Sequence, residues 1–172
     1  AQASINPQRE TNLKSLATGE MAKFVTPVEA APAPVNSFQD PTGAPKRIAD
    51  FRGKVTVVNL WATWCGLCVI EMPTLAKLAA EYQGKPVEIV AISVDRPDDA
   101  DKARAFIAKH APLAFYHDPK MALPFAFKPT ASGMPTTIIY GADGVERGRL
   151  AGGADWGGKD AKALIDKVLA ES

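Results

Sequence analysis

The sequence has almost no net charge and no long apolar run. Its 20 Lys and Arg residues nearly balance its 19 Asp and Glu residues, whereas nucleic-acid binding depends on a concentrated basic surface. No stretch approaches the roughly 20 apolar residues that span a bilayer, and the start, AQASINPQRE, lacks the basic and apolar regions of a signal peptide. We therefore expect no nucleic acid as a partner, while an anchor upstream of these residues stays open.

Cysteine is scarce, because the chain contains only Cys65 and Cys68. Two cysteines cannot build a disulfide-rich scaffold, and the loop closed by a Cys-x-x-Cys bond is too short to restrain much of the unfolded chain. A bond between them is therefore a poor structural staple. The pair is better interpreted as a disulfide that is made and broken during function.

A length of 172 residues suits one domain with an appendage. Residues 1–36 are predicted to form an N-terminal extension, with a short helix within 9–24 and then a Pro- and Ala-rich linker that resists regular structure. Residues 37–172 are the predicted domain. It opens with two short strands around a Pro-Thr-Gly turn, which indicates a hairpin.

The apolar pattern of the domain alternates between strands and helices. Residues 54–62 and 86–95 are nearly uninterrupted apolar runs, typical of strands buried on both faces. Between them, Leu75, Leu78 and Tyr82 recur at helical spacing. Strand, helix and strand in this order predict a right-handed parallel crossover.

The second half of the chain continues this alternation. The pattern predicts a helix over 96–110, a strand over 113–118, a short broken helix over 119–128, an antiparallel hairpin over 135–152 and a helix over 155–170. The whole is an α/β fold in which a mixed sheet carries helices on both faces, and we find no internal repeat.

Cys65 lies where the first buried strand gives way to a helix. At such a position unpaired backbone N–H groups and the helix dipole favour thiolate over thiol, and thiolate is the nucleophile of disulfide exchange. Cys65 is therefore the predicted attacking sulfur. Cys68, one turn further on, can attack the mixed disulfide formed at Cys65 and release the partner reduced.

Glu71 follows Cys68 on the same face of the predicted helix. In one interpretation it is a desolvated carboxyl with a raised pKa that exchanges protons with the Cys68 sulfur. In the other it is a wet surface carboxylate that complements the positive end of the helix dipole. The residues alone leave both interpretations open.

Metal binding and peroxide reduction are the competing functions. Two thiolates suit Cu(I), and a Cu(I) metallochaperone would need Cys65, Cys68 and a histidine. Neither His110 nor His117 stands at ligand spacing, so we predict no metal site. A thiol peroxidase would carry the pattern Pro-x-x-x-Thr-x-x-Cys, which the sequence lacks.

Two tryptophans and one proline add to the picture of the site. Trp61 belongs to an apolar strand and is predicted to lie in the core, whereas Trp64, next to Cys65, is predicted to be exposed over the site. Pro135 opens a predicted strand, where an ordinary trans proline suits only an edge. Because only about 5% of X–Pro bonds are cis, these residues by themselves do not predict a cis bond before Pro135.

Taken together, these motifs resemble a known family. The chain is similar to the thioredoxin-fold TlpA/ResA/CcmG group, and to bacterial TlpA above all, through DFRGK, VVNLWATWC, EMP, GMPTT and GGADW, with SLATGEMA in the extension. The resemblance implies a thioredoxin-like fold with the group's insertion at about 98–128. It also implies that Cys65 is the attacking thiol and Cys68 the resolving one, and it favours the functional role for Glu71.

The resemblance further implies where a protein partner binds. The partner groove is expected beside the cysteines, with Pro135 in the cis form. Its residues are Trp64, Gly66, Leu67, Met134, Pro135 and Thr136.

Members of this group are similar in being periplasmic reductants of particular protein disulfides, and they are often tethered to the inner membrane. The resemblance therefore implies a thiol–disulfide oxidoreductase without a cofactor, supplied by an upstream membrane electron donor. Its partners would be a Sco-type copper chaperone, cytochrome oxidase subunit II or apocytochrome c, which means a role in cytochrome oxidase assembly or cytochrome c biogenesis. We expect a monomer.

The chain departs from the group at three points. Leu67 stands where the group usually has proline, so the loop should be less rigid and the apolar surface beside Cys65 larger. Asn59 occupies the position at which thioredoxin carries a buried aspartate, which removes a proton relay through that site. The additional cysteine pair of TlpA is missing, which leaves the extension without a covalent tie.

Overall fold

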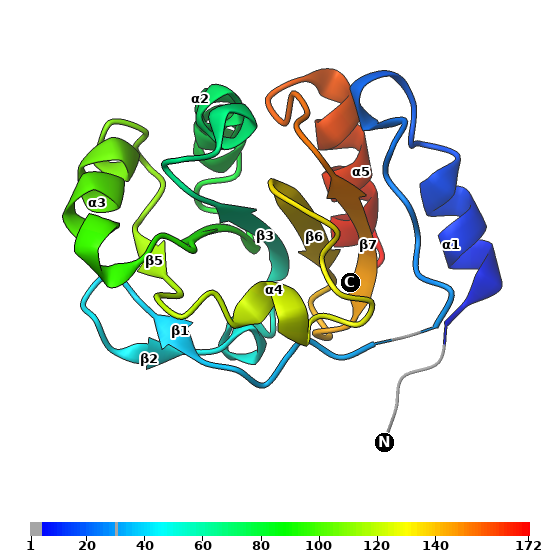
Figure 1. The fold of residues 1–172 in the computed structure, drawn as a ribbon. Coiled ribbons are helices and arrows are strands. Elements are labelled where there is room, and N and C mark those ends of the chain that lie inside the picture. The colour runs from blue at the N-terminus through cyan, green and yellow to red at the C-terminus, as the bar shows by residue number, and fades with distance from the viewer. Residues whose placement is uncertain (1–4, 30) are drawn as a thin grey trace.

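Seven strands form one mixed sheet in the computed structural model, which describes residues 5–29 and 31–172 (Figure 1). Their order across the sheet is β2-β1-β5-β4-β3-β6-β7. The strands are β1 (Phe38–Gln39), β2 (Pro45–Lys46), β3 (Val55–Trp61), β4 (Val87–Ser93), β5 (Tyr116–His117), β6 (Thr136–Tyr140) and β7 (Glu146–Ala151).

The pairing of the strands agrees with the pattern of the sequence. β3 and β4 pair in parallel over their whole length, from Val55 opposite Val87 to Trp61 opposite Ser93. β6 and β7 form an antiparallel hairpin, as do β1 and β2. The predicted parallel crossover and both predicted hairpins are confirmed.

Helices cover both faces of the sheet (Figure 1). Residues of α2, α3 and α5 pack into the core on one face, whereas α4 packs into the core on the other. The predicted α/β, thioredoxin-like fold is therefore confirmed, and α3, β5 and α4 occupy the expected insertion. The helices are α1 (Pro7–Lys14), α2 (Gly66–Glu81), α3 (Ala100–Ala108), α4 (Leu123–Ala126) and α5 (Lys159–Ala170).

β3 separates the two cores because successive side chains of a strand point to opposite faces. All seven residues of β3 are buried. Val57 and Trp61 belong to the core under α2, while Val58 and Leu60 belong to the core on the α4 side. The predicted core position of Trp61 is confirmed, and the strand holds the start of α2 in a fixed place above the sheet.

The N-terminal extension packs against the domain. Its helix α1 begins at Pro7, two residues before the predicted segment, with the side chain of Asn6 as its N-cap. Leu13, Met21 and Phe24 are fully buried in the same core as α2 and α5. Phe24 lies so close to β7 that a Cβ at Gly148 would come within 2.2 Å of its ring. The division at residue 36 between extension and domain stays a prediction.

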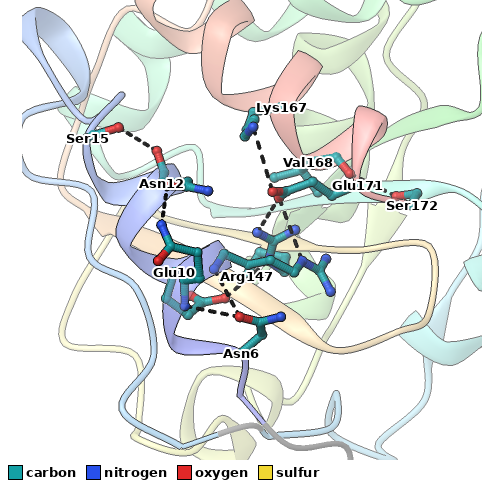
Figure 2. Close-up of polar contacts among 11 residues, drawn as sticks. Asn6, Glu10, Asn12, Ser15, Arg147, Lys167, Val168, Glu171 and Ser172 are labelled. Atoms are coloured by element: carbon teal, nitrogen blue, oxygen red, sulfur yellow. Dashed lines mark hydrogen bonds and ion pairs between the residues drawn. The ribbon is translucent and has the colours of Figure 1, made fainter.

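A buried group of charges joins the extension to the rest of the fold (Figure 2). The guanidinium of Arg147, on β7, donates to Glu10 of α1 at 3.3 Å and to Glu171, just after α5, at 2.6 Å. The Arg147 side chain is only 4% exposed. Burial raises the pKa of Glu10, against the lowering effect of Arg147. The extension, which lacks a disulfide, is thus held by buried apolar side chains and by this ion-pair cluster.

Within residues 5–29 and 31–172, no helix has both the length and the apolar character needed to cross a bilayer.

Candidate active site

Cys65 and Cys68 lie at the N-terminus of α2 and are joined by a disulfide. Cys65 is the N-cap residue of α2, and its Sγ accepts a hydrogen bond from the backbone N–H of Cys68 at 3.2 Å. Cys65 is 9% exposed, whereas Cys68 is completely buried. A partner can therefore reach only the Cys65 sulfur directly.

The position of Cys65 also favours its ionised form once the disulfide is reduced. A helix N-terminus presents backbone N–H groups without intrahelical partners, together with the positive end of the helix dipole. Both stabilise a negative charge on the sulfur and lower the pKa of such a thiol below the ordinary value of about 8.5. Cys65 thus lies where the backbone would stabilise a thiolate.

Glu71 lies in the protein interior one turn after Cys68 and is 3% exposed. The wet-surface interpretation of this residue is therefore wrong. Burial raises the pKa of Glu71 to about 7, although three hydrogen bonds to its carboxylate act in the opposite direction. A carboxyl with such a pKa can take up or release a proton near neutral pH.

The raised pKa of Glu71 predicts a pH-dependent stability. The ordinary value is 4.5 and the value in the fold is about 7, so between these pH values the native state binds more protons than the unfolded chain. Stability therefore falls as the pH rises through this window, by about 3 kcal/mol at about 1.4 kcal/mol per pKa unit. Urea unfolding of the oxidised protein from pH 4 to pH 8 measures this loss.

The variant Glu71→Gln should lose this contribution to the pH dependence, because glutamine does not titrate. Glu81→Gln, at the exposed end of the same helix, is the matched control and should keep the wild-type slope. Parallel curves for wild type and Glu71→Gln would contradict the assignment.

Three donors hold the Glu71 carboxylate. Oε1 accepts from Asn59 Nδ2 at 3.0 Å, and Oε2 accepts from the Ala154 N–H at 2.9 Å and from Trp156 Nε1 at 3.1 Å. The sequence marked Asn59 as a difference from thioredoxin but did not predict its contact with Glu71. The positions of Ala154 and Trp156 were not foreseen, although both belong to the motif GGADW that helped to identify the family resemblance.

The loop before Cys65 is held by a second buried carboxylate, which the sequence analysis missed. Both oxygens of Asp95 accept from the Thr63 N–H at 3.1 Å, and Oδ1 also accepts from the Thr63 hydroxyl at 2.5 Å. Asp95 is fully buried, and Ser93 Oγ donates to it at 2.6 Å. The end of β4 thereby fixes the segment that carries Trp64 and Cys65. Its only sequence signal was an acidic residue at the end of a buried strand.

Three large apolar side chains close to Cys65 in the sequence are exposed. Trp64 is 58% exposed, as predicted, and Leu67 is 57% exposed. Ile70, one turn along α2 from Leu67, is 73% exposed and was not among the predicted partner-binding residues. Its spacing of three residues from Leu67 could have indicated it. Gly66, between the tryptophan and the leucine, is also exposed.

The segment Met134–Thr136 lies beside the same end of the sheet. Its Met134–Pro135 peptide is cis. Thr136 pairs with Leu60, near the end of β3 from which the chain continues to Cys65. Met134 packs against the core that contains both cysteines. The buried Thr136 hydroxyl donates to Gly133 at 2.6 Å, so this side chain faces inward.

Comparison with known protein families agrees with this arrangement. A family model described as Redoxin matches residues 29–165. The chain belongs to the Redoxin family. The predicted membership in the thioredoxin-fold TlpA/ResA/CcmG group is confirmed by the following relatives and by the fold.

Two curated relatives of this Redoxin-family chain carry names that describe thiol chemistry or the thioredoxin fold. The chain is 31% identical over 115 residues to "Thiol-disulfide oxidoreductase ResA" of Bacillus thuringiensis (strain Al Hakam). The aligned segment covers 65% of this chain and 63% of the relative. The chain is 37% identical over 79 residues to "Thioredoxin-like protein YneN" of Bacillus subtilis (strain 168), and this segment covers 45% of this chain and 46% of the relative. The chain thus spans less than two thirds of each relative.

A solved structure from Chlorobium tepidum is similar over more of the chain. It is provisionally described as a thiol:disulfide interchange protein DsbE, with a TM-score of 0.67 and 29% sequence identity. The superposition covers 82% of this Redoxin-family chain and 95% of the Chlorobium protein.

Neither histidine joins the cysteine pair. His110 Nδ1 lies 3.0 Å from the Phe106 carbonyl oxygen, and the buried His117 has its Nε2 2.7 Å from the Asp95 carbonyl oxygen. In the part of the chain that the structure describes, no three His, Cys, Asp or Glu side chains gather in a way that could hold a metal ion. A Cu(I) site therefore has no third ligand of these types among the described residues.

Proposed function

We propose that this protein is a thiol–disulfide oxidoreductase that exchanges the Cys65–Cys68 disulfide and dithiol with the disulfides of other proteins. The observation that carries the proposal is the pair itself: Cys65, 9% exposed at a helix N-terminus, is bonded to Cys68, which is completely buried. The name of the ResA relative supports the same chemistry.

In the reducing direction, the Cys65 thiolate attacks a disulfide of the partner. A bond forms between Cys65 and one partner sulfur, the partner disulfide breaks, and the other partner sulfur leaves as a thiolate. Cys68 then loses its proton and attacks the Cys65 sulfur, which closes the Cys65–Cys68 bond and releases the second partner thiol. Two electrons pass to the partner, and an upstream dithiol must restore the reduced pair.

Glu71 is the proposed proton acceptor and donor for Cys68 in this cycle. It lies one helical turn from Cys68, and its pKa of about 7 lets both of its forms exist at neutral pH. Among the described residues of α2 within one turn of the cysteines, no other ionisable side chain has a raised pKa. Glu71 is thus a candidate catalytic residue beside Cys65 and Cys68.

The apolar surface around Cys65 is the proposed docking site for the partner. Trp64, Leu67 and Ile70 expose large side chains there, and the exposed Gly66 and the half-buried Met134 extend the proposed surface. Pro135 and Thr136 are buried, so we propose that they support this surface from below. Leu67 replaces the proline that is usual in the group, so this surface is larger than a proline would give. It suits an apolar segment next to the partner's cysteine.

The finer assignments rest on the family resemblance. The proposed partners are a Sco-type copper chaperone, cytochrome oxidase subunit II or apocytochrome c, with a membrane electron donor upstream. The proposed location is the periplasm, and a membrane tether and a monomeric state belong to the same proposal. We do not favour a Cu(I) metallochaperone, because the two histidines make other contacts.

Equilibration with defined mixtures of reduced and oxidised glutathione tests both the exchange and its direction. Thioredoxin, a reductant, has a reduction potential of about −270 mV, and DsbA, an oxidant, has one of about −120 mV. If this protein is a reductant, its reduction potential should lie closer to that of thioredoxin. A potential near that of DsbA would reverse the direction but keep the exchange. A protein that exchanges no disulfide with glutathione or with a protein substrate would overturn the proposed function.

A further inference from the structure

The hydrogen bonds of Glu71 suit only one of its two protonation states. Its three partners, Asn59 Nδ2, the Ala154 N–H and Trp156 Nε1, are all donors. A carboxylate accepts from all of them, but a carboxylic acid carries a proton that needs an acceptor. Oε2 already accepts two hydrogen bonds and Oε1 only one, so the proton is expected on Oε1. In the orientation that directs its O–H at the Nδ2 group of Asn59, two donors face each other.

Asn59 carries an unused acceptor on the same side-chain amide. The residue is completely buried, and its Nδ2 donates both to Glu71 and to Thr137 Oγ1, each at 3.0 Å. Its Oδ1 is buried and has no hydrogen-bond partner among the described residues. A buried polar atom without a partner is uncommon, so it calls for an explanation.

Rotation of this amide by about half a turn exchanges its oxygen and its nitrogen, which have nearly the same shape. After the rotation, Oδ1 lies where Nδ2 now lies, within hydrogen-bond reach of Glu71 Oε1 and Thr137 Oγ1. It could then accept from the Glu71 carboxylic acid and from the Thr137 hydroxyl. One amide atom stays unpaired in either orientation, but the contact between two donors is removed.

We propose that Asn59 is a positioning residue whose side-chain amide rotates with the protonation of Glu71, with Nδ2 facing the carboxylate and Oδ1 facing the carboxylic acid. This inference rests on the proposed function, in which Glu71 takes the proton of Cys68. The proton moves from the Cys68 sulfur to Glu71, Asn59 turns to accept the new O–H, and both changes reverse when Glu71 releases the proton.

The surroundings of Glu71 contain few other groups that could drive such a change. On α2 the ionisable neighbours are Cys65 and Cys68, which form the disulfide. The loop from Ala154 to Trp156 carries one carboxylate, Asp155, which is exposed and accepts from the Gly157 N–H at 3.0 Å. β3 and β6 contribute Asn59 and Thr137, which are uncharged. A step in the Asn59 amide near neutral pH therefore reports Glu71.

Nuclear magnetic resonance of the oxidised full chain, labelled with nitrogen-15, tests the proposal between pH 5 and pH 9. The Trp156 indole N–H should shift with the titration of Glu71, and the two Asn59 amide protons should shift with the same midpoint. At low pH the nuclear Overhauser effects from these amide protons to the Thr137 side chain should be lost. An indole that titrates while those effects persist at every pH would overturn the rotation. A site with no titrating signal would overturn it as well.

The variant Glu71→Gln supplies the control, because glutamine is neutral at every pH. The Asn59 amide should then keep a single orientation over the whole range. A step that persists in this variant would belong to another group and would contradict the proposal. Disulfide exchange with glutathione is measured on the same samples, so a failed rotation with intact exchange leaves the proposed function standing.

Discussion

Replacing Cys68 with serine should turn the protein into a trap for its partners, with stable mixed disulfides through Cys65. The wild-type intermediate is short-lived because Cys68 is held one turn away, and well-placed intramolecular groups act at effective concentrations far above the millimolar range of free thiols. Without Cys68 only external thiols can release the partner. The lifetime of the mixed disulfide should therefore rise by about 10³-fold or more, as measured by non-reducing gel electrophoresis and mass spectrometry.

Two further variants make this test decisive. Cys65→Ser should form no mixed disulfide and should lose exchange activity to background, since Cys68 is completely buried and a partner cannot reach it. Cys68→Ala controls for a hydrogen bond between the new serine hydroxyl and Glu71. This variant should accumulate the same mixed disulfides through Cys65. Trapping through neither cysteine, or equal trapping through both, would refute the assigned order of attack.

Replacing Arg147 with methionine should cost about 3 kcal/mol of stability or more. Arg147 is 4% exposed and lies between Glu10 and Glu171, whose side chains are 14% and 15% exposed (Figure 2). Its loss leaves Glu10 and Glu171 without their buried cation, because Arg9 and Lys167 near Glu171 are about one third exposed and lie 3.8 and 3.9 Å away. Breaking a buried pair in this way typically costs about 3–5 kcal/mol. Urea unfolding of the oxidised protein at neutral pH measures the difference.

The surface pair of Lys54 and Glu88 provides the matched control. Its atoms are 3.7 Å apart, and its side chains are 52% and 37% exposed, so Lys54→Met should change stability by less than about 1 kcal/mol. Adding Glu10→Gln and Glu171→Gln to the Arg147 variant should restore part of the loss, because the unpaired charges are removed. Equal effects at the two sites would show that the buried cluster does not hold the extension.

Much of the fold follows from local sequence pattern. The apolar runs at β3 and β4 are long and β-branched, the helix between them has regular apolar spacing, and the Asp-Gly turn between β6 and β7 is a strong hairpin signal. These signals are strong because each depends on residues that are close in sequence. The beginning of α1 was predicted less well, because a polar helix with Asn6 as its cap has little apolar periodicity.

The candidate site could be predicted only in part. Cys68 and Glu71 are three residues apart on one helix, so their common face followed from helical geometry. The partners of Glu71 come from elsewhere: Asn59 is 12 residues away, Ala154 is 83 and Trp156 is 85. Asp95 and Thr63 meet across 32 residues. Contacts over such distances depend on how β3, β4 and the loop before α5 assemble.

The amino-acid sequence by itself determined the order of strands and helices and placed two sulfurs at the start of a helix, because both depend on neighbouring residues. Tertiary structure decided which sulfur is exposed, whether Glu71 is wet or buried, and what holds the extension in place. These properties depend on solvent exclusion by Trp156, Phe24 and other side chains that are distant in sequence, and burial changes the energy of a charge far more than local geometry does.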